Sequence, residues 1–311
     1  MSSNTQSIVC CLGDPVAGNP TQFLMQRAAA SLGMDWMFVT AEVPEDRLHE
    51  AFLGIRALKF SGVAFLSPHQ QAASSLVDSL TESALRSGQV RVARRDGDAW
   101  LGDDTLGMAI VELLSNNESN FQPTRDSTAH HDARAAQDPR LNSDQQSNAA
   151  RGLLCAGLDW MPHLIRLARP DWSSRIYHWD AKKEEPQRVT SELVEISGIE
   201  RTQAGEETVQ TDGANFSCSS FAIFIIDSTS PPITIKQLSK IIGAENEITA
   251  VFVHHNAAWE SAIQKLDVAR KHVFRSFDVA AAKAAVNFQF WTGQPPEFAS
   301  IRDSLDEYCQ W

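Results

Sequence analysis

The stretch Leu101-Gly-Asp-Asp-Thr-Leu-Gly107 leads out of a strand and into a helix. Just before it, Asp96-Gly97 is a dipeptide typical of tight β-hairpin turns. An earlier stretch, Gly62-Val-Ala-Phe-Leu-Ser-Pro-His-Gln70, begins as an apolar strand and ends at a proline turn. Together the two stretches indicate an α/β domain in the first part of the chain.

Apolar strands alternate with helical stretches over residues 1–116. The strands are short apolar runs, and the helices have one apolar face or a proline in the first turn. This order predicts one α/β domain with a mostly parallel sheet and a single hairpin. The expected strands are Ser7–Gly13, Trp36–Val43, Gly62–Leu66, Val90–Arg94 and Trp100–Leu101, and the expected helices are Thr21–Leu32, Pro44–Ile55, Ala73–Ser87 and Thr105–Leu114.

Residues 117–150 differ in composition from the chain on either side. They are rich in Asn, Gln, Ser, Asp and Ala and contain almost no large apolar side chain. Such a segment cannot bury enough surface to offset the entropy cost of ordering, so we predict a flexible, partly disordered linker. His130-His131 lies within it, and we interpret this pair as part of a solvated loop rather than as metal ligands.

Strand and helix alternation begins again after the linker. Phe221–Ile226 is apolar throughout, as strands of buried parallel sheets are. We predict a doubly wound, Rossmann-like sheet over residues 151–278 and a C-terminal helical segment, 279–311, that returns to the N-terminal domain. The other expected strands are Gly152–Gly157, Ser174–Trp179 and Ile248–Val253, and the expected helices are Met161–Ala168 and Val279–Trp291.

Composition limits the location and the partners of the protein. The chain has 311 residues, a net charge of −12, 43% hydrophobic residues and no apolar run of the roughly 20 residues that span a bilayer. We therefore expect a soluble cytoplasmic protein, a monomer or homodimer, that binds neither nucleic acid nor membrane. The five cysteines lack the spacing of metal sites, so we expect no metal and buried free thiols, as at Cys10, Cys11 and Cys155.

The two stretches quoted first resemble the two catalytic signatures of the shikimate dehydrogenase family. That family writes them as Gly-Asn-Val-Thr-Val-Pro-(aromatic)-Lys and Gly-Asp-Asn-Thr-Asp-Gly. Near the C-terminus, Phe288-Gln-Phe-Trp-Thr-Gly293 is similar to the family's Phe-Glu-Leu-Trp-Thr-Gly. The resemblance implies an N-terminal substrate-binding α/β domain and a C-terminal Rossmann-like domain with a cleft between them. It also implies NADPH-dependent reduction of 3-dehydroshikimate on the route to chorismate and the aromatic amino acids.

Both titrating positions of the family's catalytic pair are substituted. Gln70 stands at the position of the catalytic Lys, and Leu106 stands at that of the catalytic Asp. Hydride transfer to a ketone needs a proton donor, which contributes about 10²–10⁴-fold in rate, and neither side chain can give up a proton at neutral pH. His69 can titrate, but in an extended segment it points away from the face of Gln70. We therefore assign no catalytic residue.

Substrate-binding positions depart from the family pattern as well. The family's Ser-x-Ser-Pro is Ala17-Gly18-Asn19-Pro20 here, an Asn is replaced by Arg91, and the Gln of the C-terminal helix is replaced by Lys283. Lys and Gln have thus exchanged positions between 70 and 283. We advance the hypothesis that Arg91 and Lys283 form a cationic pocket for a small anionic metabolite. The alternative is that Lys283 is a solvated helix residue and Arg91 an exposed strand residue. Gln70, Asp103 and Asp104 complete the pocket candidates, although the two carboxylates are also typical of turn capping.

Cofactor positions are equally altered. The family's Gly-Ala-Gly-Gly-Ala is Cys155-Ala-Gly-Leu-Asp159, which leaves one of the three glycines that let a pyrophosphate approach the backbone. Gly157, Asp180 and Thr229 remain as weak candidates for contacts with NADP or NAD, and we interpret Asp180 as a strand-end residue. Neither dinucleotide is expected to bind more tightly than millimolar. His255 takes the place of a family Tyr at the cleft, where we expect a hydrogen-bonded structural histidine.

Three functions follow from this pattern. The first is a catalytically degenerate shikimate dehydrogenase homologue, a pseudoenzyme, with a binding or regulatory role near aromatic amino-acid biosynthesis. The second is an NAD(P)-dependent oxidoreductase of shikimate/quinate type with an altered substrate and rearranged acid and base groups. The third is a cofactor-independent sensor of small anions.

Overall fold

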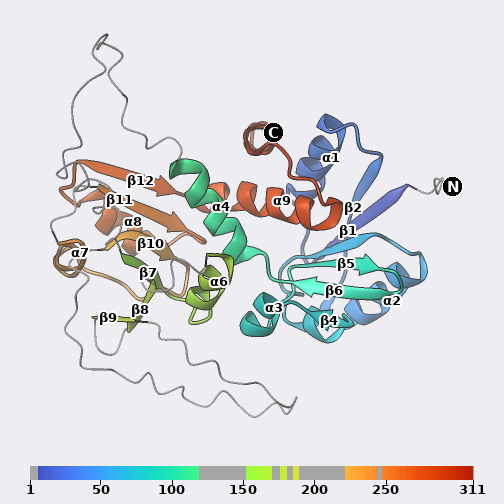
Figure 1. Ribbon diagram of the computed structural model, residues 1–311, viewed down its shortest axis with the longest axis horizontal. Coiled ribbons are helices and arrows are strands. Elements are labelled where there is room, and N and C mark those ends of the chain that lie inside the picture. The colour runs from blue at the N-terminus through green and yellow to red at the C-terminus, as the bar shows by residue number, and fades with distance from the viewer. Residues whose placement is uncertain are drawn as a thin grey trace, which may run out of the picture. The chain divides into compact units, whose positions relative to one another are not determined.

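The computed structural model describes residues 6–118, 152–169, 176–180, 185–188, 221–243 and 247–310 (Figure 1). Contacts divide these residues into two compact units. Unit 1 holds the elements up to residue 118, helix α6 (Met161–Ala168) from His163 onward, and everything after Arg275; unit 2 holds the other described elements. The predicted linker 117–150 lies outside the described residues, except that residues 117 and 118 are the last two of helix α4 (Leu106–Glu118).

Unit 1 contains a six-stranded sheet with the order β2-β1-β3-β5-β6-β4. The apolar run of β1 is parallel to both of its neighbours, as a buried central strand requires. The β5–β6 hairpin turns at Gly97, whose φ of 62° suits glycine, and confirms the Asp96-Gly97 prediction. The strands are β1 (Ser7–Gly13), β2 (Trp36–Glu42), β3 (Gly62–Phe65), β4 (Ser79–Leu80), β5 (Val92–Asp96) and β6 (Ala99–Asp103).

Two apolar clusters lie on opposite faces of this sheet. Val9 and Cys11 of β1 pack with residues of α1, α9 and α10, whereas Cys10 and Leu12 pack with α2. The alternation follows from the two-residue period of a strand. Because Cys10 and Cys11 are free and buried, they serve as small core residues. The helices are α1 (Thr21–Ser31), α2 (Leu48–Ala57), α3 (Glu82–Ser87), α4, α9 (Ser276–Thr292) and α10 (Phe298–Tyr308).

One predicted helix of unit 1 is wrong, and another is shorter than expected. The segment Ala73–Ser87 is a short 3-10 turn (Ala72–Ser75), then β4, then α3. The chain leaves the helical path because β4 pairs with β6, and Thr81 then caps α3 by accepting a hydrogen bond from the Ala84 backbone N–H. The predicted helix Pro44–Ile55 begins as a 3-10 turn and becomes α-helical only at Leu48.

Helix α9 completes unit 1 although it follows unit 2 in the sequence. The indole Nε1 of Trp291 donates a hydrogen bond to the Ala93 carbonyl of β5 at 3.0 Å. A Cβ at Gly62 would lie 2.6 Å from the same Nε1, so the glycine of β3 is required by the close approach of this ring. The family-like stretch that begins at Gly62 and the one that contains Trp291 therefore pack against each other in unit 1.

Unit 2 contains a second six-stranded sheet, with the order β12-β11-β10-β7-β8-β9. All pairs are parallel except β8–β9, and the order reverses direction between β7 and β10. Helices α7 and α8 supply Leu238 and Trp259 to its apolar core. The elements are β7 (Gly152–Ala156), β8 (Ile176–Asp180), β9 (Glu185–Arg188), β10 (Phe221–Ile226), α7 (Ile235–Ile242), β11 (Glu247–Phe252), α8 (Ala257–Gln264) and β12 (Arg270–Phe274).

This order is that of a doubly wound sheet, as the sequence predicts. Ligands of such sheets bind beyond the carboxyl ends of the strands at the point of reversal. Here that point is the turn after β7 together with the end of β10. No helix in the described part of the chain is both long enough and apolar enough to cross a membrane.

Candidate functional site

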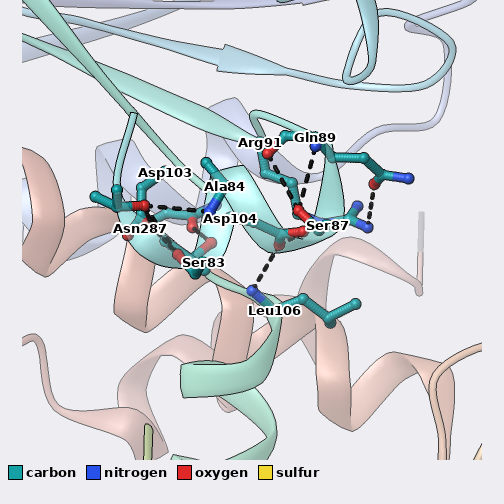
Figure 2. Close-up of polar contacts among 11 residues, drawn as sticks. Ser83, Ala84, Ser87, Gln89, Arg91, Asp103, Asp104, Leu106 and Asn287 are labelled. Carbon is teal, nitrogen blue, oxygen red and sulfur yellow. Dashed lines mark hydrogen bonds and ion pairs between the residues drawn. The ribbon is translucent and has the colours of Figure 1, made fainter. Parts of the chain in front are cut away.

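The turn between β6 and α4 carries two adjacent carboxylates that point to different partners. Asp103 accepts hydrogen bonds from the hydroxyls of Thr81 and Ser83, at the start of α3. Figure 2 shows this carboxylate beside α3, on the other side of the turn from Arg91. The structure thus gives Asp103, a pocket candidate from the sequence, the role of fixing α3 to the sheet.

Asp104 is the buried carboxylate of the turn. Its Oδ1 accepts hydrogen bonds from Arg91 Nε at 2.9 Å and from the Leu106 backbone N–H at 3.1 Å (Figure 2). Its Oδ2 is also buried, and no group in the described ranges donates to it. A buried carboxylate oxygen without a donor is costly, so this atom marks a place where a further donor would be stabilising.

Arg91 is held beside Asp104 by two side chains. Besides the bond from Nε to Asp104, its Nη2 donates to Gln89 Oε1 at 2.8 Å. Only 11% of the Arg91 side chain is exposed. This contradicts the alternative in which Arg91 is an exposed strand residue, since it lies just before β5 and is desolvated by the turn.

Lys283 of α9 belongs to the same cluster. It is partly buried, and desolvation lowers its pKa from 10.5 to about 8. Arg91 lowers this pKa further through like charge, whereas Asp104 raises it. Lys283 is therefore not a freely solvated helix residue, as the alternative supposed. Its ammonium group has a pKa close to neutral pH and lies near an arginine and a carboxylate.

Asn287 lies one helical turn after Lys283 and fixes α9 to the turn. Its Oδ1 accepts a hydrogen bond from Thr105 Oγ1 at 2.6 Å, and both residues are buried. Residues four apart share one face of a helix, so the Lys283–Asn287 spacing could have placed Asn287 in the site. Asn287 is absent from the site residues expected from the sequence. Gln89 is absent as well, because no sequence pattern indicates a side-chain hydrogen bond between residues 89 and 91.

Gln70 and Leu106, which the sequence resemblance aligns with the family's catalytic pair, are side chains without acid or base chemistry. Leu106 is 1% exposed, and only its backbone N–H contacts Asp104. The Gln70 carbonyl accepts a hydrogen bond from the Val90 N–H, and its side chain is partly exposed. His69 is fully buried, and its Nε2 lies 2.8 Å from the Val43 carbonyl, a partner outside this cluster.

The glycines that survive in the turn are required for packing. A Cβ at Gly107 would lie 2.8 Å from the Leu164 carbonyl oxygen of α6. A Cβ at Gly102 would lie 2.8 Å from the Val90 side chain. Neither glycine has the positive φ that favours this residue type. The retained pattern of the turn therefore preserves close contacts of the fold.

The turn after β7 in unit 2 holds a carboxylate of its own. Gly157 has a φ of 127°, and a Cβ there would lie 2.6 Å from Asp227 Cγ. Asp227, directly after β10, accepts a hydrogen bond from the Leu158 backbone N–H at 2.8 Å through Oδ2. Its Oδ1 accepts hydrogen bonds from the backbone N–H and the hydroxyl of Thr229, both at 2.6 Å.

These residues do not fit the pyrophosphate of NADP or NAD. A phosphate at this turn needs free backbone N–H groups and open space over glycine. The Leu158 N–H and the face of Gly157 are occupied by the Asp227 carboxylate, and Thr229 points its donors to the same group. Two of the three weak cofactor candidates, Gly157 and Thr229, are thus occupied within the protein.

The remaining candidates have structural positions. Asp180 is the last residue of β8, the strand-end position that we expected. His255 is largely exposed and its Nδ1 lies 3.3 Å from Glu260 Oε1, so the expected hydrogen-bonded histidine has its partner on helix α8, which begins two residues after it. Across the described ranges, no group of three or more His, Cys, Asp or Glu side chains could hold a metal ion.

Residues 11–92 match the sequence family described as the shikimate dehydrogenase substrate binding domain. Over 119 residues the chain is 33% identical to shikimate dehydrogenase (NADP(+)) of Rubrobacter xylanophilus, which covers 38% of this chain. The N-terminal part of the chain, residues 11–92, belongs to the shikimate dehydrogenase family. It spans about two fifths of the length of the curated relatives that it matches, 41% in this case and 37% for the relative from Geobacter metallireducens.

Solved structures of similar fold superpose over nearly the whole length of the chain. Shikimate 5-dehydrogenase of Thermus thermophilus, solved with NADP(H) and shikimate, superposes with a TM-score of 0.59 at 15% identity, covering 97% of this chain and all of that one. The 5-ketofructose reductase of a Gluconobacter strain has a TM-score of 0.58 at 14% identity, covering 98% and 99%. At this identity the likeness shows the fold alone, and two differently named enzymes share it.

Proposed function

We propose that this shikimate dehydrogenase-like protein is a pseudoenzyme that binds a small organic anion in unit 1 and uses no dinucleotide. The observation that carries the proposal is the cluster of Arg91, Lys283 and Asp104, in which one buried carboxylate oxygen has no described donor. Two cations and one carboxylate leave this cluster with a net positive charge when Lys283 is protonated. It suits an anionic ligand that also carries a hydroxyl group.

Each group of the cluster has a role toward such a ligand. Arg91 uses Nε and Nη2 for Asp104 and Gln89, and no acceptor in the described ranges contacts its Nη1. Nη1 and the Lys283 ammonium would donate to a ligand carboxylate. Asp104 Oδ2 would accept a hydrogen bond from a ligand hydroxyl and so gain its missing donor. The ligand class that we propose is therefore a small hydroxy acid.

The experiment compares binding by wild type and by an Arg91→Ala/Lys283→Ala double variant. Shikimate, dehydroshikimate and inorganic phosphate are titrated by calorimetry and by thermal shift. We expect hydroxy-acid binding that is weakened at least about tenfold in the double variant, because both charge-assisted contacts are lost. An Arg47→Ala/Lys265→Ala variant removes the same two charges at exposed positions and should bind as wild type does. Absent hydroxy-acid binding, or equal binding in all three proteins, would refute the proposal.

A second candidate function is favoured by one observation, the lowered pKa of Lys283. An ammonium group with a pKa of about 8 can both give and take a proton near neutral pH, which an oxidoreductase with a rearranged acid would need. The test is oxidation of shikimate or quinate with NADP or NAD, followed by the absorbance of the reduced cofactor. Under our first proposal there is no turnover. Turnover that disappears in Lys283→Ala would establish the second function instead.

A cytoplasmic location is part of the proposal. It is supported by the thiols of Cys10, Cys11 and Cys155, which are free and buried in the described structure. A role near aromatic amino-acid biosynthesis is also part of the proposal. It is supported by the similarity to shikimate dehydrogenases, and identifying the bound hydroxy acid would test it.

A further inference from the structure

The glycine turn of unit 2 contains a carboxylate that is held from several sides. The Leu158 N–H, the Thr229 N–H and the Thr229 hydroxyl all donate to Asp227, which is only 4% exposed. The Asp227 backbone is fixed as well, because its N–H donates to Ser230 Oγ at 2.9 Å and its carbonyl accepts a hydrogen bond from Asn256 Nδ2 at 3.0 Å. The carboxylate is therefore a permanent part of the turn rather than a mobile side chain.

We propose that Asp227 is an internal anion that occupies the phosphate position of this Rossmann-like sheet and excludes nucleotides from it. The position is the point of strand reversal between β7 and β10, where doubly wound sheets bind their ligands. There a backbone N–H after a glycine points at a negative group, as it would at a phosphate oxygen. The inference concerns unit 2 alone and is independent of the ligand proposed for unit 1.

Three effects act together against a nucleotide phosphate. The carboxylate fills the space over Gly157 that a phosphate would use. It also takes the Leu158 N–H, so a phosphate would have to displace it and leave a buried carboxylate without a donor. Its charge repels any phosphate that comes close. The same charge acts on the neighbouring Cys155 thiol. Burial raises the pKa of this thiol, and the negative charge of Asp227 raises it further.

The test replaces Asp227 and measures the affinity for ADP and for inorganic pyrophosphate. Asp227→Asn removes the charge and keeps the shape, whereas Asp227→Ser also opens the space over Gly157. We expect both variants to bind the two probes at least about tenfold more tightly than wild type does, with Asp227→Ser the tighter. Asp267→Asn removes the same charge at an exposed position of unit 2 and should not change the affinity. Folded Asp227 variants with no gain in affinity would overturn the proposal.

A measurement on wild type decides the matter if the variants do not fold. The backbone amide resonances of Gly157 and Leu158 are followed by NMR during a titration with millimolar ADP. We expect these resonances to remain in place, because the Leu158 N–H stays bonded to Asp227. Saturable shifts of the two resonances would show that a phosphate reaches the turn, and the internal-anion assignment would then be wrong.

Discussion

At the scale of single residues, two substitutions in the family pattern compensate each other. By the resemblance, Asp104 and Arg91 each stand where the family has Asn, and these two side chains form a buried ion pair. Either charge alone would be left uncompensated in a site that is almost closed to water. The pair therefore has to be gained or lost as a unit, together with the charge on Lys283 that both residues influence.

Replacing Asp104 by Asn should lower both stability and the pKa of Lys283. The Leu106 N–H keeps its acceptor, but Arg91 loses a charged partner, so we expect the free energy of unfolding to fall by about 1–3 kcal/mol. Because Asp104 raises the pKa of Lys283, its removal should shift that pKa below its present value of about 8. Urea unfolding and the pH dependence of amine labelling measure the two effects. Glu50→Gln breaks an exposed pair with Arg47 and should change both much less.

Lys283 also gives the stability of the protein a definite pH dependence. Its pKa is about 8 in the folded protein, whereas a solvated lysine of the unfolded chain has the ordinary value of 10.5. Between these two pH values the unfolded chain therefore binds more protons than the folded one. Stability conferred by this residue must then rise as the pH increases from about 8 toward 10.5. Wild type should gain unfolding free energy relative to Lys283→Met when urea titrations at these two pH values are compared. A constant difference between the two proteins would contradict the lowered pKa.

At the scale of secondary-structure elements, the contact between β3 and α9 decides the packing of unit 1. The ring of Trp291 lies where a side chain of residue 62 would otherwise be, and its N–H is bonded to β5. The first and last family motifs thus meet in one contact, although Gly62 and Trp291 are 229 positions apart in the sequence. One motif supplies the space and the other fills it.

Gly62→Ala should therefore be destabilising out of proportion to its size. A methyl group cannot be accommodated without moving Trp291, and we expect a loss of about 1–3 kcal/mol in the free energy of unfolding. Gly54→Ala is the matched control, because Gly54 lies exposed in α2 with no neighbouring atom near the added methyl. That substitution should instead raise stability by about 0.5–1 kcal/mol. Equal effects of the two substitutions in urea unfolding would argue against the contact.

Most elements could be predicted because their signals are local. The apolar run of β1, the Asp96-Gly97 turn and the apolar β10 are each visible in a few adjacent residues. Ala73–Ser87 failed because pairing of β4 with β6, a contact between distant residues, overrides local helical spacing. The site divides in the same way. Arg91, Asp104 and Lys283 could be found by comparison with the family motifs, whereas the Asp227 carboxylate on Leu158 joins residues 69 apart.

At the scale of the whole molecule, unit 1 is built from three separate parts of the chain, the short middle one being His163–Arg169 in and after α6. Residues up to 118 supply its sheet, and the residues after Arg275 supply α9 and α10. Phe288, Trp291, Ile301 and Leu305 of these helices are buried in the same cluster as Val9 and Cys11. The first part alone would cover this face of its sheet with α1 only and would expose the rest of the cluster to water.

A chain ending after Arg275 should therefore lose the structure of unit 1. The apolar face of β1 would be uncovered, and α1 would lose its packing against α9 and α10. Hydrogen exchange would then show unprotected amides in α1 (Thr21–Ser31), whereas β10 and β11 of unit 2 should stay protected. Phe288→Ala in the full chain is the milder form, with an expected loss of about 3–5 kcal/mol. Protection of α1 in the shortened chain would contradict this account.

Trp291 lies near the C-terminal end of the sequence, and this position affects how the protein folds during synthesis. A ribosome synthesises β1 through α4 first, yet the helix that covers one face of this sheet follows only after the whole of unit 2. During that interval the nascent chain carries the apolar side chains of Val9, Cys11 and Phe38 without their cover. Such surface is what chaperones bind and what promotes aggregation during synthesis. The first domain to begin folding is thus the last to finish.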